Sequence, residues 1–216
     1  MKMRGFTLVE IAIVLVIVGL LLAAVLKGQE LVTQGKIKGA IADFNGVLTA
    51  FNGYQDRYKA IPGDDAHADR WTTTGLIVVD GDGNGIVAGD YNATPSNPST
   101  SVQESNNFWW FLRLANFYPG AATVSAGPIQ PTNSVGGVIG VQNSALGMNG
   151  LVICLTAVPY KIAIAVDTQI DDGNATTGSV RALAYTTALP TGAELSATPT
   201  AAYIEGSTYV LCRSAS

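Results

Sequence analysis

Oxygen-bearing side chains alternate with glycines over residues 80–86, which read DGDGNGI. Asp80, Asp82 and Asn84 supply carboxylate and amide oxygens at every second position, and the glycines between them allow a tight coil. Calcium takes about six to eight oxygen ligands of this kind. The spacing resembles the first half of an EF-hand-type calcium loop, in which Ile86 offers its backbone carbonyl.

The second half of such a loop departs from the pattern. Its twelfth position is Tyr91 rather than a bidentate glutamate, so Asp90 or the distant Glu104 has to complete the coordination. A hydrated Asp/Gly turn without a metal is the alternative. The predicted calcium ligands are Asp80, Asp82, Asn84, Ile86, Asp90 and Glu104.

A second acidic turn at residues 171–174 reads DDGN. We interpret Asp171 and Asp172 as turn formers that pair with Arg181, with a second metal site as the less favoured alternative. His67 lies in an acidic segment, and we predict that this lone histidine is solvated rather than catalytic.

The composition excludes several classes of protein. Of 216 residues, 48% are apolar and 13% are charged, about half the usual charged share, which excludes a disordered acidic or basic chain. The net charge is −4 and no basic cluster occurs, so nucleic-acid binding is not predicted. One histidine and two cysteines exclude three-His and Cys₄ zinc sites. The chain has no G-x-S-x-G and no Walker loop, and we predict that it is not an enzyme.

An apolar run of 21 residues extends from Phe6 to Leu26 and contains one charge, Glu10. As a helix it spans about 31 Å, enough for a bilayer core, and a short basic leader, MKMRG, precedes it. Signal peptides and simple signal anchors do not favour a carboxylate at the head of this core. An acid in such a segment therefore needs a partner that explains it.

The run from Gly5 to Glu10, GFTLVE, resembles the leader junction of type IV pilins and type II secretion pseudopilins. The resemblance implies that a prepilin peptidase cleaves between Gly5 and Phe6 and methylates the new amino terminus of Phe6. It also implies a filament of pilin-like subunits, in which Glu10 meets the amino terminus of Phe6 on a neighbour. Inner-membrane assembly machinery is the further partner. Glu10 at the lipid interface is the simpler alternative.

Two later strings, YQDRYKAIPGDD near residue 60 and DDGN…TGSVR near residue 175, are similar to a subgroup of bacterial pilin-like proteins. Some pseudopilins bind calcium in the globular domain. The resemblance therefore implies that residues 80–86 bind calcium here.

The periodicity predicts one helix from Phe6 to Ala60. Its second half carries a stripe at steps of 3 and 4, and Pro62-Gly63 ends it. The stripe consists of Ile37, Ile41, Phe44, Leu48, Phe51, Tyr54 and Tyr58. Five glycines follow the apolar run inside this helix and favour either close packing or local melting. They are Gly28, Gly35, Gly39, Gly46 and Gly53.

The remaining chain predicts an α+β fold with a mainly antiparallel sheet. We expect a core helix over 106–118, capped by Ser105 and carrying Trp109, Trp110, Phe111 and Leu114. Strands are expected at 76–79, 151–157, 160–166, 179–185 and 207–212. The predicted division is a leader (1–5), a membrane or filament-core helix (6–30), an amphipathic helix (31–62) and a globular domain (63–216), with residues 92–102 as a polar loop.

Cys154 and Cys212 both fall in predicted strands, with 57 residues between them. A domain exported through the membrane meets an oxidising compartment, which favours a disulfide over two free thiols.

The sequence thus predicts a filament subunit that is a single-pass inner-membrane protein before assembly, with a periplasmic domain. After assembly it lies in a periplasmic or extracellular filament. The alternative is a membrane-anchored, calcium-stabilised extracellular binding module.

Overall fold

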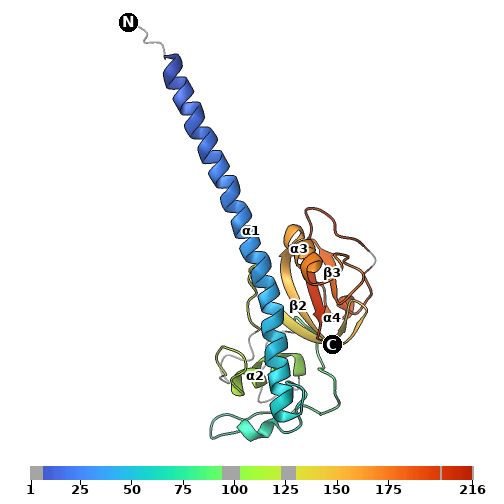
Figure 1. Cartoon of the computed structure of the whole chain (residues 1–216). Coiled ribbons are helices and arrows are strands. Elements are labelled where there is room, and N and C mark those ends of the chain that lie inside the picture. Colours follow the sequence, from blue (N-terminus) through green and yellow to red (C-terminus); the bar gives the residue numbers. More distant parts are fainter. Residues whose placement is uncertain (1–6, 94–102, 123–129, 200, 216) are drawn as a thin grey trace. The chain divides into compact units, whose positions relative to one another are not determined.

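The computed structural model describes residues 7–93, 103–122, 130–199 and 201–215. The chain divides into two compact units, residues 1–36 and 37–216. Helix α1 (Leu8–Tyr58) runs through both and is drawn as one continuous coil in Figure 1. A long amino-terminal helix followed by a four-stranded antiparallel sheet confirms the predicted α+β class.

The first part of α1 is apolar and unburied. An 18-residue window has a mean hydropathy of 3.1, and none of it is buried. By length and composition this helix can cross a membrane. The helix ends where Lys59 adopts a left-handed conformation with φ of 56°, three residues before Pro62.

The second part of α1 packs on the core of the second unit, as the predicted stripe requires. The buried side chains recur at helical spacing, while Ile41, Leu48 and Tyr58 pack at the margin. The buried residues are Ile37, Ala40, Phe44, Val47, Ala50, Phe51 and Tyr54.

Two of the six glycines in α1 allow close packing. A Cβ atom on Gly39 would lie 2.6 Å from Ser134 Cβ, and one on Gly53 would lie 2.8 Å from the Phe117 ring. The other four, Gly19, Gly28, Gly35 and Gly46, face open space.

The sheet contains β1 (Ile139–Ala145), β2 (Met148–Pro159), β3 (Val180–Tyr185) and β4 (Thr208–Ser214) in the order β1-β2-β4-β3. Every neighbouring pair is antiparallel. The predictions over 151–157, 179–185 and 207–212 are confirmed within a few residues, whereas β1 was not predicted.

Side-chain alternation gives the sheet two apolar faces. Ile153 and Leu155 of β2 join the large cluster that includes residues of α1 and of two shorter helices, α2 (Glu104–Leu114) and α3 (Tyr160–Ile170). Val152 and Cys154 point to the other face, where they pack with Leu195 of the short helix α4 (Gly192–Leu195).

Helix α2 (Glu104–Leu114) begins and ends earlier than predicted. Gln103, not Ser105, occupies the N-cap position, so the predicted cap is wrong. Ser105 is buried inside the first turn because Glu104 already belongs to the helix. The predicted core residues Trp109, Trp110 and Phe111 are fully buried, and Leu114 packs against the same cluster.

Two predicted strands are wrong. Residues 160–166 belong to helix α3 (Tyr160–Ile170), which Figure 1 shows beside the sheet. Its buried positions, Ile162, Ala163, Val166 and Asp167, follow a helical rather than an alternating pattern. Residues 76–79 form only an isolated bridge from Leu76 to Thr73, because no neighbouring strand pairs with them. The short helix η1 (Ala68–Trp71) precedes this segment.

Candidate functional site

The amino-terminal motif begins with Gly5 and Phe6, which lie outside the described residues. The predicted assembly residue Glu10 is described, and it is hydrogen-bonded to Thr7. The Thr7 amide and Thr7 Oγ1 both donate to Glu10 Oε2 at 2.8 Å. In return, the Glu10 amide donates to Thr7 Oγ1 at 3.3 Å. This reciprocal arrangement is a capping box at the start of α1.

Three carboxylates meet in the second unit. Oxygen atoms of Asp64, Asp82 and Glu104 all lie within 4.8 Å of one another. Asp64 and Glu104 are 4% and 3% exposed, and Asp82 is exposed. We call these three residues the acidic group. Neither of the two ion pairs found among the described residues includes them, so no basic side chain is paired with their negative charge.

Backbone amides of the DGDGNGI loop, and of Ala88 just after it, bind two of these carboxylates. Asp64 accepts from the amides of Asn84 at 3.0 Å and Gly85 at 2.8 Å. Glu104 accepts from the amides of Asp82 at 3.1 Å and Ala88 at 2.8 Å. The loop therefore surrounds two carboxylates that come from other parts of the chain. Asp64 lies in the segment after α1, and Glu104 lies in the first turn of α2.

The loop approaches Asp64 so closely that Gly81 is required. A Cβ atom on Gly81 would lie 2.4 Å from Asp64 Cα. Asp64 itself is fixed through its neighbour Asp65, which accepts from Tyr54 Oη at 2.6 Å and from Arg70 Nη1 at 2.7 Å. The end of α1 therefore positions the acidic group through Tyr54.

Burial raises the pKa values of the two buried members of the acidic group, Asp64 and Glu104. Burial raises the pKa of Asp64, and the adjoining Asp82 carboxyl raises it further, while backbone amide donors oppose the shift. Burial likewise raises the pKa of Glu104, with the charges of Asp64 and Asp82 adding to the effect.

The acidic group has the chemistry of a hard-cation site. Its donors are all carboxylate oxygens, which calcium and magnesium prefer. A cation there would offset three neighbouring negative charges, two of them nearly removed from water. A cavity of about 280 Å³ borders Asp64, Gly83 and Gly85.

Of the four carboxylates among the predicted calcium ligands, Asp80, Asp82, Asp90 and Glu104, the structure brings Asp82 and Glu104 together. Asp80 accepts from the Asp69 amide at 2.6 Å, and Asn84 bonds to Asp82 and to the Ile86 amide. Asp90 lies against Gly192 of α4. Asp64 was missed because it lies 16 residues before the motif, in the PGDD string, and only the fold brings it to the loop.

The second acidic turn forms another carboxylate group, Asp167, Asp171 and Asp172. Each of its members is used locally: Asp167 accepts from Tyr203 Oη, Asp171 from the Val180 amide and Asp172 from the Asn174 amide. The predicted pairing with Arg181 is not among the ion pairs of the described residues. Arg181 instead donates to the Leu146 and Gly178 carbonyls.

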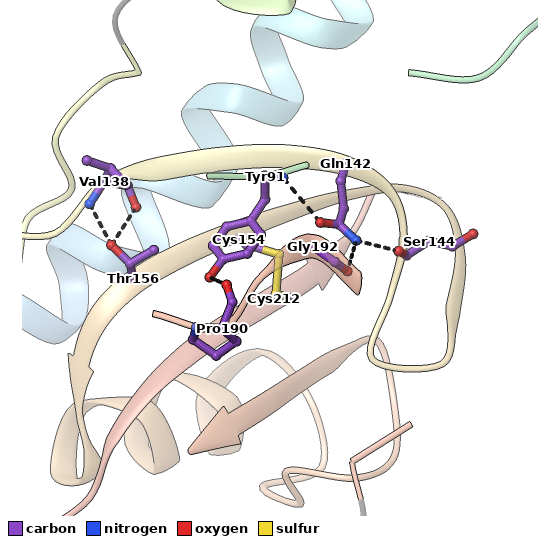
Figure 2. The surroundings of a disulfide bond; sticks show 9 residues. All are labelled: Tyr91, Val138, Gln142, Ser144, Cys154, Thr156, Pro190, Gly192 and Cys212. Carbon is purple, nitrogen blue, oxygen red and sulfur yellow. Dashed lines mark hydrogen bonds between the residues drawn. A yellow bond between two sulfur atoms is a disulfide. The ribbon is translucent and has the colours of Figure 1, made fainter. Parts of the chain in front are cut away.

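Cys154 and Cys212 form the predicted disulfide. They are directly opposite each other on β2 and β4, and both are fully buried. Figure 2 shows Tyr91 beside them, donating its hydroxyl to the Pro190 carbonyl at 2.7 Å. Gln142 accepts from the Tyr91 amide and donates to the Gly192 carbonyl, which fastens the 190–192 segment over this face of the sheet.

One comparison with known proteins identifies the amino terminus. The family model of the prokaryotic N-terminal methylation motif matches residues 1–26. No curated protein and no solved structure matches the chain. The chain thus carries the signature of type IV pilins and pseudopilins, on a long helix that precedes an α+β domain.

Proposed function

We propose that this chain is a structural subunit of a type IV pilus-like or type II secretion pseudopilus filament. The observation that carries the proposal is the methylation motif at residues 1–26 on a helix whose apolar window is entirely unburied. Such a surface is stable in a bilayer or in a bundle of like helices, and costly in water. We assign the chain no catalytic role.

Processing comes first in this proposal. A prepilin peptidase cleaves between Gly5 and Phe6 and methylates Phe6. The subunit then waits in the inner membrane, with its globular domain in the periplasm. Inner-membrane machinery afterwards moves it into the filament, where the apolar helices of many subunits pack together.

Glu10 sets the register of assembly. Its Oε2 atom accepts both hydrogen bonds from Thr7, and Oε1 accepts none within the described part of the chain. One carboxylate oxygen is therefore available to the amino terminus of Phe6 on a neighbouring subunit. In a low-dielectric bundle an unpaired carboxylate is costly, so one axial offset between helices is preferred.

Calcium bound to the acidic group stabilises the globular domain. Asp64, Asp82 and Glu104 supply the carboxylates, and carbonyl oxygens or water complete the coordination. The ion joins the end of α1, the DGDGNGI loop and the start of α2 in a region where the loop contributes few apolar side chains.

The intact mass of the protein purified from its own membrane tests this function. We expect residues 6–216 plus one methyl group, less two hydrogens for the disulfide, as the polypeptide mass. A chain that retains residues 1–5, or that is cut after the apolar run, overturns the filament proposal. Either of these results would favour an anchored, calcium-stabilised binding module or a secreted domain.

A further inference from the structure

The sequence repeats one five-residue pattern, Asp-Xaa-Asn-Ala-Thr, at residues 90–94 and 172–176. These are the two places in the chain where asparagine is followed two residues later by serine or threonine without an intervening proline. That triplet is the acceptor for attachment of a glycan to the asparagine amide nitrogen in exported proteins. The structure distinguishes the two copies.

Asn174 is exposed in the loop between α3 and β3. Its Oδ1 atom accepts from the Thr176 amide at 3.1 Å and from Thr176 Oγ1 at 2.9 Å. The asparagine and the hydroxyl of its triplet are therefore already in contact. Asn174 Nδ2, the atom that would carry a sugar, makes no hydrogen bond to the described part of the chain.

Asn92 differs at the same atom. Its Nδ2 donates to the Pro190 carbonyl at 3.1 Å, and the side chain is half-buried. Tyr91, its neighbour, is fully buried and donates to the same carbonyl. A sugar on Asn92 would break this attachment of the 190–192 segment, whereas a sugar on Asn174 would project into solvent. Thr94 lies outside the described residues.

We propose that Asn174 is a glycosylation site, the acceptor of an oligosaccharide carried on a membrane lipid diphosphate. The inference rests on the proposed function, because that function places the domain on the side of the membrane where such transfer occurs. Asn174 Nδ2 forms a bond to the anomeric carbon of the sugar, and the bond from that carbon to the diphosphate oxygen breaks. The lipid diphosphate leaves with the electron pair, and the proton lost from Nδ2 passes to a base of the transferase. No oxidation or reduction is involved.

The fold also indicates that glycan transfer precedes the folding of this loop. Ala175, between the two triplet residues, is fully buried, and its carbonyl accepts from the Ala182 amide of β3 at 2.9 Å. A transferase that needs an extended triplet therefore acts before this loop closes on β3. The finished fold retains the glycan without strain because Asn174 remains exposed.

Mass spectrometry of the chain from its own membrane tests the inference. We expect the intact mass to exceed the processed polypeptide mass by one glycan, and fragmentation to place that glycan on Asn174. Asn174→Gln and Thr176→Val should each abolish the added mass, whereas Thr176→Ser, Thr177→Val and Asn92→Gln should retain it.

A processed, methylated chain with unmodified Asn174 overturns this inference and leaves the filament proposal intact. A glycan that persists in Asn174→Gln also overturns it. A glycosylated chain that retains residues 1–5 has the opposite meaning, because it supports the modification and overturns the filament proposal.

Discussion

Thr7 and Glu10 bond to each other in both directions at the start of α1. Two donors on Thr7 reach Glu10 Oε2 at 2.8 Å, and the Glu10 amide reaches Thr7 Oγ1 at 3.3 Å. The same pairing recurs at α4, where Thr191 and Glu194 form a capping box. Glu10 therefore has a structural role within its own subunit besides the intersubunit role that we propose.

Variants at these two positions separate the roles. Glu10→Ala removes both, and we expect the assembled fraction to fall at least about tenfold, which corresponds to about 1.4 kcal/mol. Thr7→Val removes the cap acceptor, costs about 1 kcal/mol of helix stability and retains the carboxylate. It should therefore assemble nearly as well as the natural chain. Sedimentation of sheared filaments measures the fraction, and equal assembly of both variants would contradict the register role.

Calcium should raise the midpoint of thermal unfolding of the full chain in detergent. At 100 times the Kd, one bound ion adds about 2.7 kcal/mol to the free energy of unfolding. Glu104→Gln removes a charge from the acidic group and should abolish most of this increase. Asp80→Asn is the matched control and should retain it, because Asp80 lies outside the group. If Asp80→Asn lost the calcium-induced increase and Glu104→Gln retained it, the result would favour the ligand set predicted from the sequence, which includes Asp80.

The pH dependence without calcium follows from the raised pKa values of Asp64 and Glu104. Each folded pKa lies above its unfolded value, so the folded state binds more protons between the two values. In chelator, these groups should therefore make the free energy of unfolding increase as the pH falls from 7 towards about 4. Denaturant unfolding at several pH values, with a chelator present, measures this dependence of the free energy of unfolding on pH.

Glu104→Gln isolates one of these contributions. Its stability relative to the natural chain should be greatest at pH 7 and should decline as the pH falls. A difference that stays constant with pH would show that Glu104 does not titrate as burial requires. With saturating calcium the trend should reverse, because the ion binds the ionised carboxylates.

Gly39 and Gly46 form a matched pair on α1. Gly39→Ala should destabilise the domain, because the new Cβ would lie 2.6 Å from Ser134 Cβ. Ser134 is fixed by two hydrogen bonds to Asp43, from its amide at 2.7 Å and its hydroxyl at 2.8 Å. Gly46→Ala meets open space and should stabilise the helix by up to about 1 kcal/mol. Thermal unfolding of both variants measures the difference, and a stabilising Gly39→Ala would show that Ser134 moves freely.

Removing the disulfide tests how the sheet is held. The Cys154→Ala/Cys212→Ala double variant should lower the free energy of unfolding by about 2–4 kcal/mol while keeping the fold. Near-ultraviolet circular dichroism checks the packing of Tyr91 beside the bond, and denaturant unfolding gives the energy. An unchanged free energy would mean that the adjacent strands alone confine this part of the chain.

Local patterns determined much of this protein. The apolar run, the 3-and-4 stripe and Pro62 predict α1 almost to its ends, because helical burial leaves a periodic record in the sequence. The cleavage motif needs only six adjacent residues, GFTLVE. The two cysteines sit in strands that short apolar runs already mark.

Tertiary structure decided what local patterns left ambiguous. Residues 160–166 are almost entirely apolar, a pattern that fits a short strand or a buried helix, and they fold as α3 with Ile162, Ala163 and Val166 buried at helical spacing. β1 (IGVQNSA) has little strand character, yet it pairs with β2 through backbone hydrogen bonds, which do not require β-branched or aromatic side chains. Asp64 joins Asp82 and Glu104 because α1 fixes Asp65 through Tyr54, and that contact spans 11 residues. A ligand group of this kind depends on the distances between elements in the folded protein. The spacing of its residues along the chain does not give those distances.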